Sequence, residues 1–222
     1  MKKHVSLLFA VCALWVLTFS GHALAGKITG TIKVSGLPSP ENIVVYITQS
    51  PPVSVDLSGA KVVMDQRNLT FVPHVLPVLV GTAVLFPNND NVNHNVFSLS
   101  RTKQFNLGSY PRGESKTVVF DQPGIVELRC DVHADMQAFI LVMENPYWAV
   151  TDSNGHFTIP DAQYFDRSGI KGIKDLAPGT YTIKTWHEKL KTGHETVTVP
   201  ENGDVSVEIH LTRGAPGVLY KR

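Results

Sequence analysis

Short stretches in which apolar and polar residues alternate run along most of this chain. In residues 28–34, Thr29, Thr31 and Lys33 separate apolar residues and glycine, which is the period of a half-buried β-strand. A β-branched run follows at 43–48, and similar runs predict strands at 61–64, 75–80, 82–86, 95–99, 116–120, 125–130 and 139–143. Long helical periodicity is absent. Turn residues about every ten positions therefore predict an all-β chain of the sandwich or Greek-key barrel type.

Turn residues also accompany the apolar runs after residue 145. Residues 151–159 contain Asp, Asn and Gly at their centre and predict a hairpin, and residues 176–184 predict a turn followed by a strand. Further strands are expected at 197–199 and 205–211. This region has no paired carboxylates and no zinc motif. Surface or rim packing is the favoured interpretation for its few residues that could carry chemistry, which are Trp186, His187, Glu188 and His194.

The first 25 residues have the features of a secretory signal peptide. Lys2 and Lys3 precede an apolar run at 5–19, and Ala23 and Ala25 form a small-x-small cleavage site. Cleavage after Ala25 would make the protein periplasmic or secreted. An uncleaved membrane anchor is the alternative.

Charge narrows the classes of partner. The chain has 20 Lys and Arg residues against 19 Asp and Glu residues. Removal of the two lysines at positions 2 and 3 leaves 18 against 19, a formal charge of −1. This balance, without a run of like charges, provides no footprint for nucleic acid or for anionic lipid. We therefore expect neither nucleic-acid binding nor stable membrane insertion.

Cys130 is the only cysteine that remains after cleavage, because Cys12 lies in the signal peptide. An unpaired cysteine in an exported protein can form an intermolecular disulfide, lie buried as a thiol, or bind a metal. Its neighbours favour the metal, since His133 and Met136 add an imidazole and a thioether that suit copper. Strand alternation directs Cys130 inward, and His94 on a neighbouring strand would complete a two-histidine, one-cysteine set with an axial methionine.

Each of these residues has a less specific alternative. His94 could be a surface histidine between two asparagines, and Met136 could pack in the core, as Met64 and Met143 are expected to do. Copper ligation is preferred because of the sequence around His94 and the place of Met136 in the cysteine loop. His74 precedes a predicted strand, and we interpret it as an exposed histidine outside the site, the alternative being a residue near the metal or a partner.

Three segments between residues 61 and 144 carry a family resemblance. They are Gly-Thr-Ala-Val-Leu-Phe-Pro-Asn at 81–88, His-Asn-Val-Phe at 94–97 and Pro-Gly-Ile-Val-Glu-Leu-Arg-Cys at 123–130. Together with the Cys-x-x-His-x-x-Met loop at 130–136, they resemble cupredoxins, the blue copper proteins, most closely the amicyanin and plastocyanin branch. The resemblance implies one type 1 copper ion. It also implies that Asn95 ties the ligand segments together through hydrogen bonds, whereas a simple turn asparagine is the alternative.

Two positions of the ligand loop depart from this family. Ala134 stands where proline is common, and Asp135 stands where an apolar residue often shields the metal. A carboxylate there would favour oxidised copper over reduced copper. The resemblance therefore transfers neither a reduction potential nor a hydrophobic docking patch to this chain.

The remaining segments resemble the transthyretin-like, carboxypeptidase regulatory-like β-sandwich. Residues 146–213 lack its first two strands, and residues 27–48 resemble them. We therefore expect a cupredoxin domain at 60–145, inserted into a sandwich that 27–48 complete, with a tail at 214–222. The whole chain is similar to exported methylamine-utilization proteins in which a cupredoxin unit is joined to a second β-domain.

Two functions remain open. The first is an exported copper protein that carries single electrons, for which the resemblance implies a c-type cytochrome and a periplasmic amine or quinoprotein dehydrogenase as partners. The second is a non-redox copper-binding or partner-binding module. Copper oxidases need further copper sites, and the sequence contains no second cluster of the His-x-His kind. We therefore expect no enzyme activity.

Overall fold

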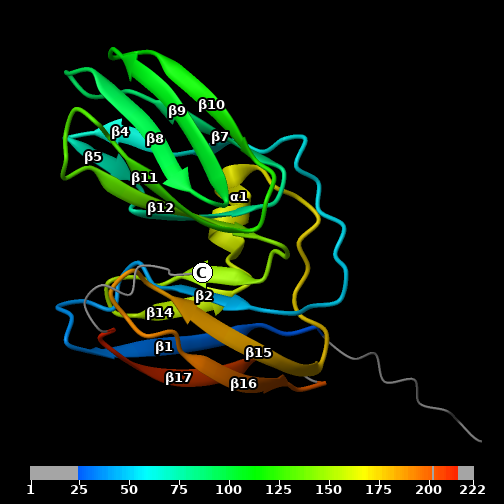
Figure 1. Cartoon of the computed structure of the whole chain (residues 1–222). Helices are drawn as coiled ribbons and strands as arrows, with labels where there is room; N and C mark the ends of the chain where they lie inside the picture. The colour runs from blue at the N-terminus through cyan, green and yellow to red at the C-terminus, as the bar shows by residue number, and fades with distance from the viewer. Residues whose placement is uncertain (1–24, 202, 215–222) are drawn as a thin grey trace, which may run out of the picture.

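The computed structural model of this chain describes residues 25–201 and 203–214. β-Strands form an upper and a lower group, with the short helix α1 (Ala162–Ser168) between them (Figure 1). The prediction of an all-β chain is confirmed, although the sheets stay open and do not close into a barrel. Within the described ranges, no helix has the length and apolar character needed to span a membrane. The predicted signal peptide up to residue 24 and the tail from residue 215 lie outside the described residues.

The upper group, called the upper lobe below, contains two sheets and a small ribbon. Its five-stranded sheet has the order β6 (Val75–Leu79), β12 (Gln137–Met143), β11 (Gly124–Arg129), β8 (His94–Ser100), β9 (Lys103–Tyr110). Its three-stranded sheet has the order β10 (Ser115–Phe120), β7 (Thr82–Pro87), β3 (Val62–Val63). The ribbon pairs β4 (Asp65–Arg67) with β5 (Thr70–Val72).

Strand alternation gives the upper lobe one shared apolar core. Phe86 and Phe120 of the three-stranded sheet and Val126 and Leu128 of β11 are all fully buried in it. Cys130, which follows β11 on the same face, is 5% exposed. The predicted inward direction of this face is therefore confirmed, and it places the cysteine sulfur inside the lobe.

The lower group, called the lower lobe, encloses a second core between two sheets. One sheet has the order β14 (His156–Ile159), β1 (Ile28–Ser35), β17 (Val205–Thr212). The other has the order β13 (Trp148–Val150), β2 (Val44–Ile47), β15 (Gly179–Trp186), β16 (His194–Val199). The first strand of the described residues, β1, blue in Figure 1, thus lies parallel to the last described strand, β17, in red. Both N-terminal strands pair with strands that follow the upper lobe in sequence.

Several short elements are absent from the sequence prediction. The strands β4, β5 and β13 have three residues each, and α1 has seven, so all are shorter than the window in which periodicity becomes visible. Local capping defines α1 instead. The Asp161 carboxylate accepts the Tyr164 N–H, and Gly169 ends the helix with a left-handed φ of 71°. The longer β9 was missed because it is a half-exposed strand with a weak apolar pattern.

The predicted hairpin at 151–159 is wrong. Its turn forms, because the Asp152 carboxylate accepts the N–H groups of Asn154 and His156 and Gly155 has a φ of 83°. The flanking strands do not pair with each other, since β13 pairs with β2 and β14 pairs with β1. The turn therefore carries the chain from one lower sheet to the other, a role that the same turn residues serve equally well.

Candidate metal centre

Three of the predicted ligand side chains meet at one end of the upper five-stranded sheet. His94 begins β8, Cys130 directly follows the neighbouring β11, and His133 lies in the loop after it. The Sγ atom of Cys130 lies 4.0 Å from Nδ1 of His94 and 4.0 Å from Nδ1 of His133. The two Nδ1 atoms are 3.1 Å apart. Within the described ranges, no other set of three His, Cys, Asp or Glu residues converges in this way.

The spacing of the three donor atoms fits a transition-metal ion. A point equidistant from them lies about 2.2 Å from each, close to zinc–nitrogen and zinc–sulfur bond lengths of about 2.0–2.3 Å in proteins. One cysteine and two histidines in a trigonal set are typical of blue copper sites, whereas structural zinc sites use four tetrahedral ligands. The donor set therefore fits copper well.

Burial differs among the four predicted ligands. His94 is fully buried and Cys130 nearly so, while His133 is partly exposed. Met136 is 1% exposed, and its N–H donates to the carbonyl oxygen of His133 over 3.0 Å. This burial is compatible with both an axial ligand and a core methionine. Met64, at 0% exposure, is a core residue as expected.

Asp90 contacts the cluster and was missed in the sequence. Its Oδ2 lies 3.0 Å from Nε2 of His94 and accepts the Leu69 N–H over 2.7 Å. Hydrogen bonds from the Leu69 backbone and from the His94 side chain lower the pKa of Asp90 to about 2. Since a carboxylate only accepts, Nε2 of His94 carries the hydrogen in this contact, and the other ring nitrogen, Nδ1, faces Cys130 and His133. Such pairs fix the tautomer of a ligating histidine and raise its basicity.

Asn95 joins β8 to the cysteine through its backbone. Its N–H donates to Sγ of Cys130 over 3.5 Å, and its side-chain Nδ2 donates to Oδ1 of Asn106 in β9 over 2.8 Å. The residue is 1% exposed, so it is not a solvent-exposed turn asparagine. The backbone of Asn95 therefore holds the sulfur of Cys130 beside β8, where the first histidine of the cluster lies.

Three exposed apolar side chains belong to the segments that carry or contact the cluster. Val132 directly precedes His133 and is 52% exposed. Leu69, which is 51% exposed, is tied to the cluster through its hydrogen bond to Asp90. Val92, two residues before His94, is 42% exposed. We refer to Leu69, Val92 and Val132 as the apolar rim of the site.

The other residues singled out in the sequence lie apart from this cluster. His74 is partly exposed, and its Nε2 lies 3.1 Å from Oε1 of Glu188 in the lower lobe. His187 approaches the other oxygen of Glu188 at 3.5 Å, and both side chains are less than 10% exposed. Trp186 is also buried, whereas His194 is exposed. The surface interpretation therefore holds for His194, while the other residues form a contact between the lobes.

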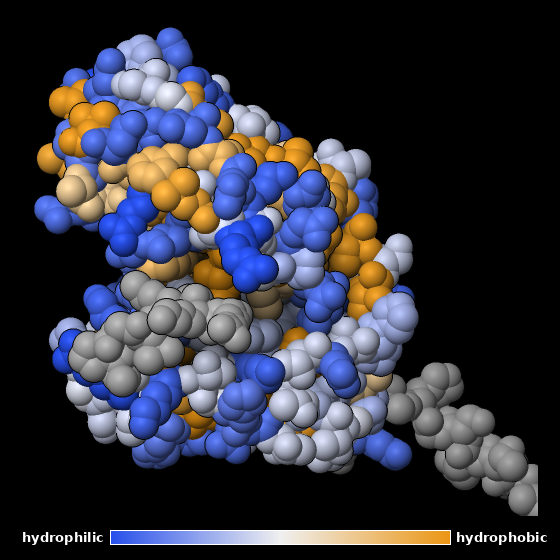
Figure 2. All heavy atoms as spheres, viewed as in Figure 1, coloured by the Kyte–Doolittle hydropathy of each residue, from blue (hydrophilic) through white to orange (hydrophobic). Residues whose placement is uncertain are grey.

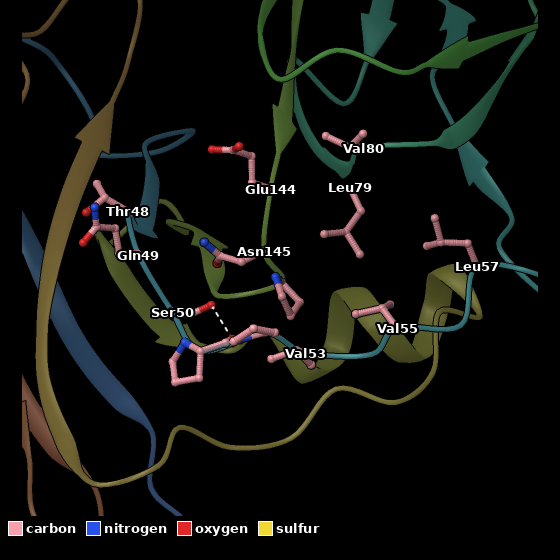
Figure 3. Close-up of a pocket in the computed structure, with 13 residues that line it drawn as sticks. Thr48, Gln49, Ser50, Val53, Val55, Leu57, Leu79, Val80, Glu144 and Asn145 are labelled. Carbon is pink, nitrogen blue, oxygen red and sulfur yellow. Dashed lines mark hydrogen bonds between the residues drawn. The ribbon is translucent and has the colours of Figure 1, made fainter.

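A hollow of about 650 Å³ lies at the opposite end of β12, between the lobes (Figure 3). Apolar and proline side chains dominate its lining, and Glu144 is the only carboxylate there. Figure 3 shows the Glu144 side chain apart from the labelled polar residues Ser50 and Asn145. This hollow offers no convergent donors for a metal ion.

No protein-family model and no curated protein matches the sequence. Among solved structures, the chain is similar to a purple cupredoxin from Nitrosopumilus maritimus, with 23% identity, a TM-score of 0.35, and coverage of 37% of this chain and 100% of that one. A reduced mutant of amicyanin shows 20% identity and a TM-score of 0.36 over 45% of this chain and 98% of the other. The copper-containing nitrite reductase of Thermus scotoductus shows 24% identity and a TM-score of 0.38. The match covers 51% of this chain and 28% of the reductase chain. Scores this low assign no activity to the chain.

Proposed function

We propose that this chain is an exported type 1 copper protein that carries single electrons between redox partners. The observation that carries the proposal is the convergence of Cys130 Sγ with Nδ1 of His94 and of His133 around one point. Copper bound there would supply a Cu(I)/Cu(II) couple whose potential depends on the axial ligand, for which we propose Met136.

The protein residues hold this donor set in place before a metal arrives. Asp90 fixes the His94 ring, and the Asn95 N–H holds the sulfur of Cys130. His94 and Cys130 lie at the ends of β8 and β11, which are hydrogen-bonded neighbours in the sheet. Fixed positions of His94 and Cys130 limit rearrangement when the charge of the centre changes, which favours rapid electron exchange.

The partly exposed His133 provides the route by which we expect electrons to enter and leave. The apolar rim around it suits the surface of a protein partner, such as a c-type cytochrome or a periplasmic dehydrogenase. A signal peptide at 1–25 would bring the chain to the same compartment as these partners.

We also propose that residues 60–145 are a cupredoxin domain inserted into a β-sandwich made of 27–48 and 146–213. The pairing of β1 with β14 and β17 supports this arrangement, as does the pairing of β2 with β13 and β15. In this arrangement, the lower lobe carries the electron-transfer domain between two strands of its own fold.

The visible spectrum of the copper-loaded chain tests the copper assignment. We expect an intense blue band from the thiolate of Cys130 in the oxidised form, and its loss on reduction. Cys130→Ser should abolish the band, whereas Val119→Ser, at an exposed position of β10, should leave it unchanged. A folded, copper-loaded chain without colour contradicts the proposal and supports the non-redox module instead.

Electron exchange is tested separately by mixing the oxidised protein with a reduced c-type cytochrome in a stopped-flow instrument. Val132→Asp places a charge on the apolar rim without touching a ligand, so we expect slower exchange with an unchanged spectrum. Equal exchange rates for the native chain and for Val132→Asp would reject the apolar rim as the docking surface.

A further inference from the structure

Two adjoining hollows lie on the outer face of the upper five-stranded sheet. The larger has a volume of about 820 Å³ and the smaller about 280 Å³, and both are lined by Gly124 and Ile125. The smaller hollow is also lined by Tyr46 and Trp186 of the lower lobe. Figure 2 shows apolar atoms along the lower border of the upper lobe, where the surface is hollowed above the lower lobe. We call these two hollows together the interlobe cleft.

Four large apolar side chains line the larger hollow. Phe97 and Leu99 lie two residues apart on β8 and therefore on one face, and Ile125 and Phe139 come from β11 and β12. Leu99 is 79% exposed, the highest value among the large apolar residues of the described part of the chain. A single exposed leucine is ordinary, but four apolar side chains around one concavity are typical of a ligand site.

The larger hollow is lined by two arginines and one glutamate, so one arginine has no carboxylate partner there. Glu127 is neutralised, because Arg129 donates to its Oε1 from Nε over 2.7 Å and approaches it with a second nitrogen at 2.6 Å. Gln137 donates to the same oxygen. Arg101 also lines the hollow, and no carboxylate among the described residues pairs with it. An anionic group entering the hollow would therefore meet Arg101.

The smaller hollow is lined by a buried tryptophan. Trp186 lines it and is 4% exposed, and its Nε1 has no hydrogen-bond partner among the described residues. Its ring packs edge-on against Phe139, which is 1% exposed, with centroids 5.1 Å apart, so one buried aromatic pair lines the two hollows.

We propose that the interlobe cleft binds a small aromatic molecule that carries one anionic group. The partly exposed ring of Phe97 provides the stacking surface, Leu99 and Ile125 add apolar contacts beside it, and Arg101 pairs with the acid. The site lies on the face of β11 opposite to Cys130 and uses none of the proposed copper ligands, so it stands independently of the copper assignment.

Isothermal titration of the whole chain with 2-naphthoate tests the proposal. Two comparison ligands separate its parts, because 2-naphthalenemethanol lacks the charge and cyclohexanecarboxylate lacks the aromatic ring. We expect 2-naphthoate to bind most tightly of the three. Leu99→Asp should weaken it by about tenfold or more, and Arg101→Glu by about tenfold. Arg101→Glu should leave binding of the uncharged alcohol unchanged.

Val119→Asp is the matched control, because it places the same charge on an exposed apolar residue, of β10, outside the cleft. Circular dichroism establishes that each variant is folded. The proposal is overturned if the native chain does not bind 2-naphthoate at about 1 mM. It is also overturned if Val119→Asp weakens binding as much as Leu99→Asp does, or if Arg101→Glu affects the acid and the alcohol equally.

Discussion

The two cores of this chain differ in what they bury besides hydrocarbon. The upper core is accompanied by six polar side chains of at most 1% exposure, which are Gln66, Thr82, Asn88, His94, Asn95 and Ser98. The polar residues buried with the lower sheets are the short Thr151 and Thr185. Burial of polar groups costs free energy unless hydrogen bonds satisfy them. The upper lobe therefore gives up stability around its donor cluster, whereas the lower lobe is built mainly for stability.

Part of that cost is offset by a hydrogen-bond network beside the cluster. The Gln66 side chain donates to the hydroxyl of Tyr110 over 2.6 Å, and that hydroxyl donates to the Phe86 carbonyl over 2.9 Å. Asn88 donates to the backbone carbonyl of Tyr110 over 3.0 Å. Tyr110 lies opposite His94 in the β8–β9 pairing. The comparison implies that stability and metal chemistry can be changed separately by substitution.

The largest effect is expected from a cavity in the lower core. Ile183 of β15 is fully buried there, so Ile183→Ala should lower the free energy of unfolding by about 2–5 kcal/mol. Urea denaturation measures this loss, and Val119→Ala on the surface should change it by less than about 0.5 kcal/mol. The folded Ile183→Ala protein should keep the absorption of its metal site. Loss of that absorption would show that the two lobes are not separable.

The contact between the lobes should depend on pH. Burial opposes ionisation of Glu188, but the hydrogen bond from His74 and the nearby His187 charge lower its pKa from 4.5 to about 2. Because the folded pKa is the lower one, the stabilisation is present above pH 4.5 and is lost as pH falls towards about 2. The difference corresponds to at most about 3 kcal/mol of the free energy of unfolding.

Glu188→Gln removes the charge that produces this dependence. The free energies of unfolding of the native chain and of Glu188→Gln, measured between pH 7 and pH 2, should therefore differ most near pH 7 and converge as the pH falls. Glu208→Gln is the control, since Glu208 pairs with His210 on the exposed surface of β17. If the free energy of unfolding of the native chain and that of Glu188→Gln changed with pH in the same way over the whole range, a charged contact between the lobes would be contradicted.

Asp90 should act on metal affinity through its contact with His94. Asp90→Asn removes the charge that orients and polarises His94, and changes in such outer contacts lower metal affinity by about 10–100-fold. Competition with a chelator measures this affinity. Asp121→Asn, at an exposed carboxylate paired with Lys103, should leave it unchanged. Equal metal affinities for Asp90→Asn and Asp121→Asn would show that Asp90 does not contribute to metal binding.

The smallest change in stability is expected at Met136. Met136→Leu preserves volume and should cost less than about 1.5 kcal/mol. If the thioether is the axial ligand, its loss withdraws a donor that supports the oxidised metal, so the reduction potential should rise while the metal stays bound. Met64→Leu makes the same exchange at a core position and should leave the potential unchanged. Equal potentials in both variants would assign Met136 to core packing.

The sequence predicted those features that depend on neighbours along the chain. Alternation along β11 directs Cys130 inward, and the loop spacing places His133 near it. Asp90 could not be selected, because a carboxylate four residues before a histidine in a polar loop is common. The burial of Trp186 and Glu188 depends on how the two lobes pack together, which local pattern does not encode. Turn chemistry at 151–159 likewise did not reveal which sheets the flanking strands would join.

A crystal structure of the copper-loaded chain, with anomalous scattering recorded at the copper edge, tests the central claim most directly. We predict an anomalous peak within about 2.3 Å of Sγ of Cys130 and of Nδ1 of His94 and His133. A well-ordered structure with no copper between these atoms, or with copper bound only at other histidines, would contradict the account.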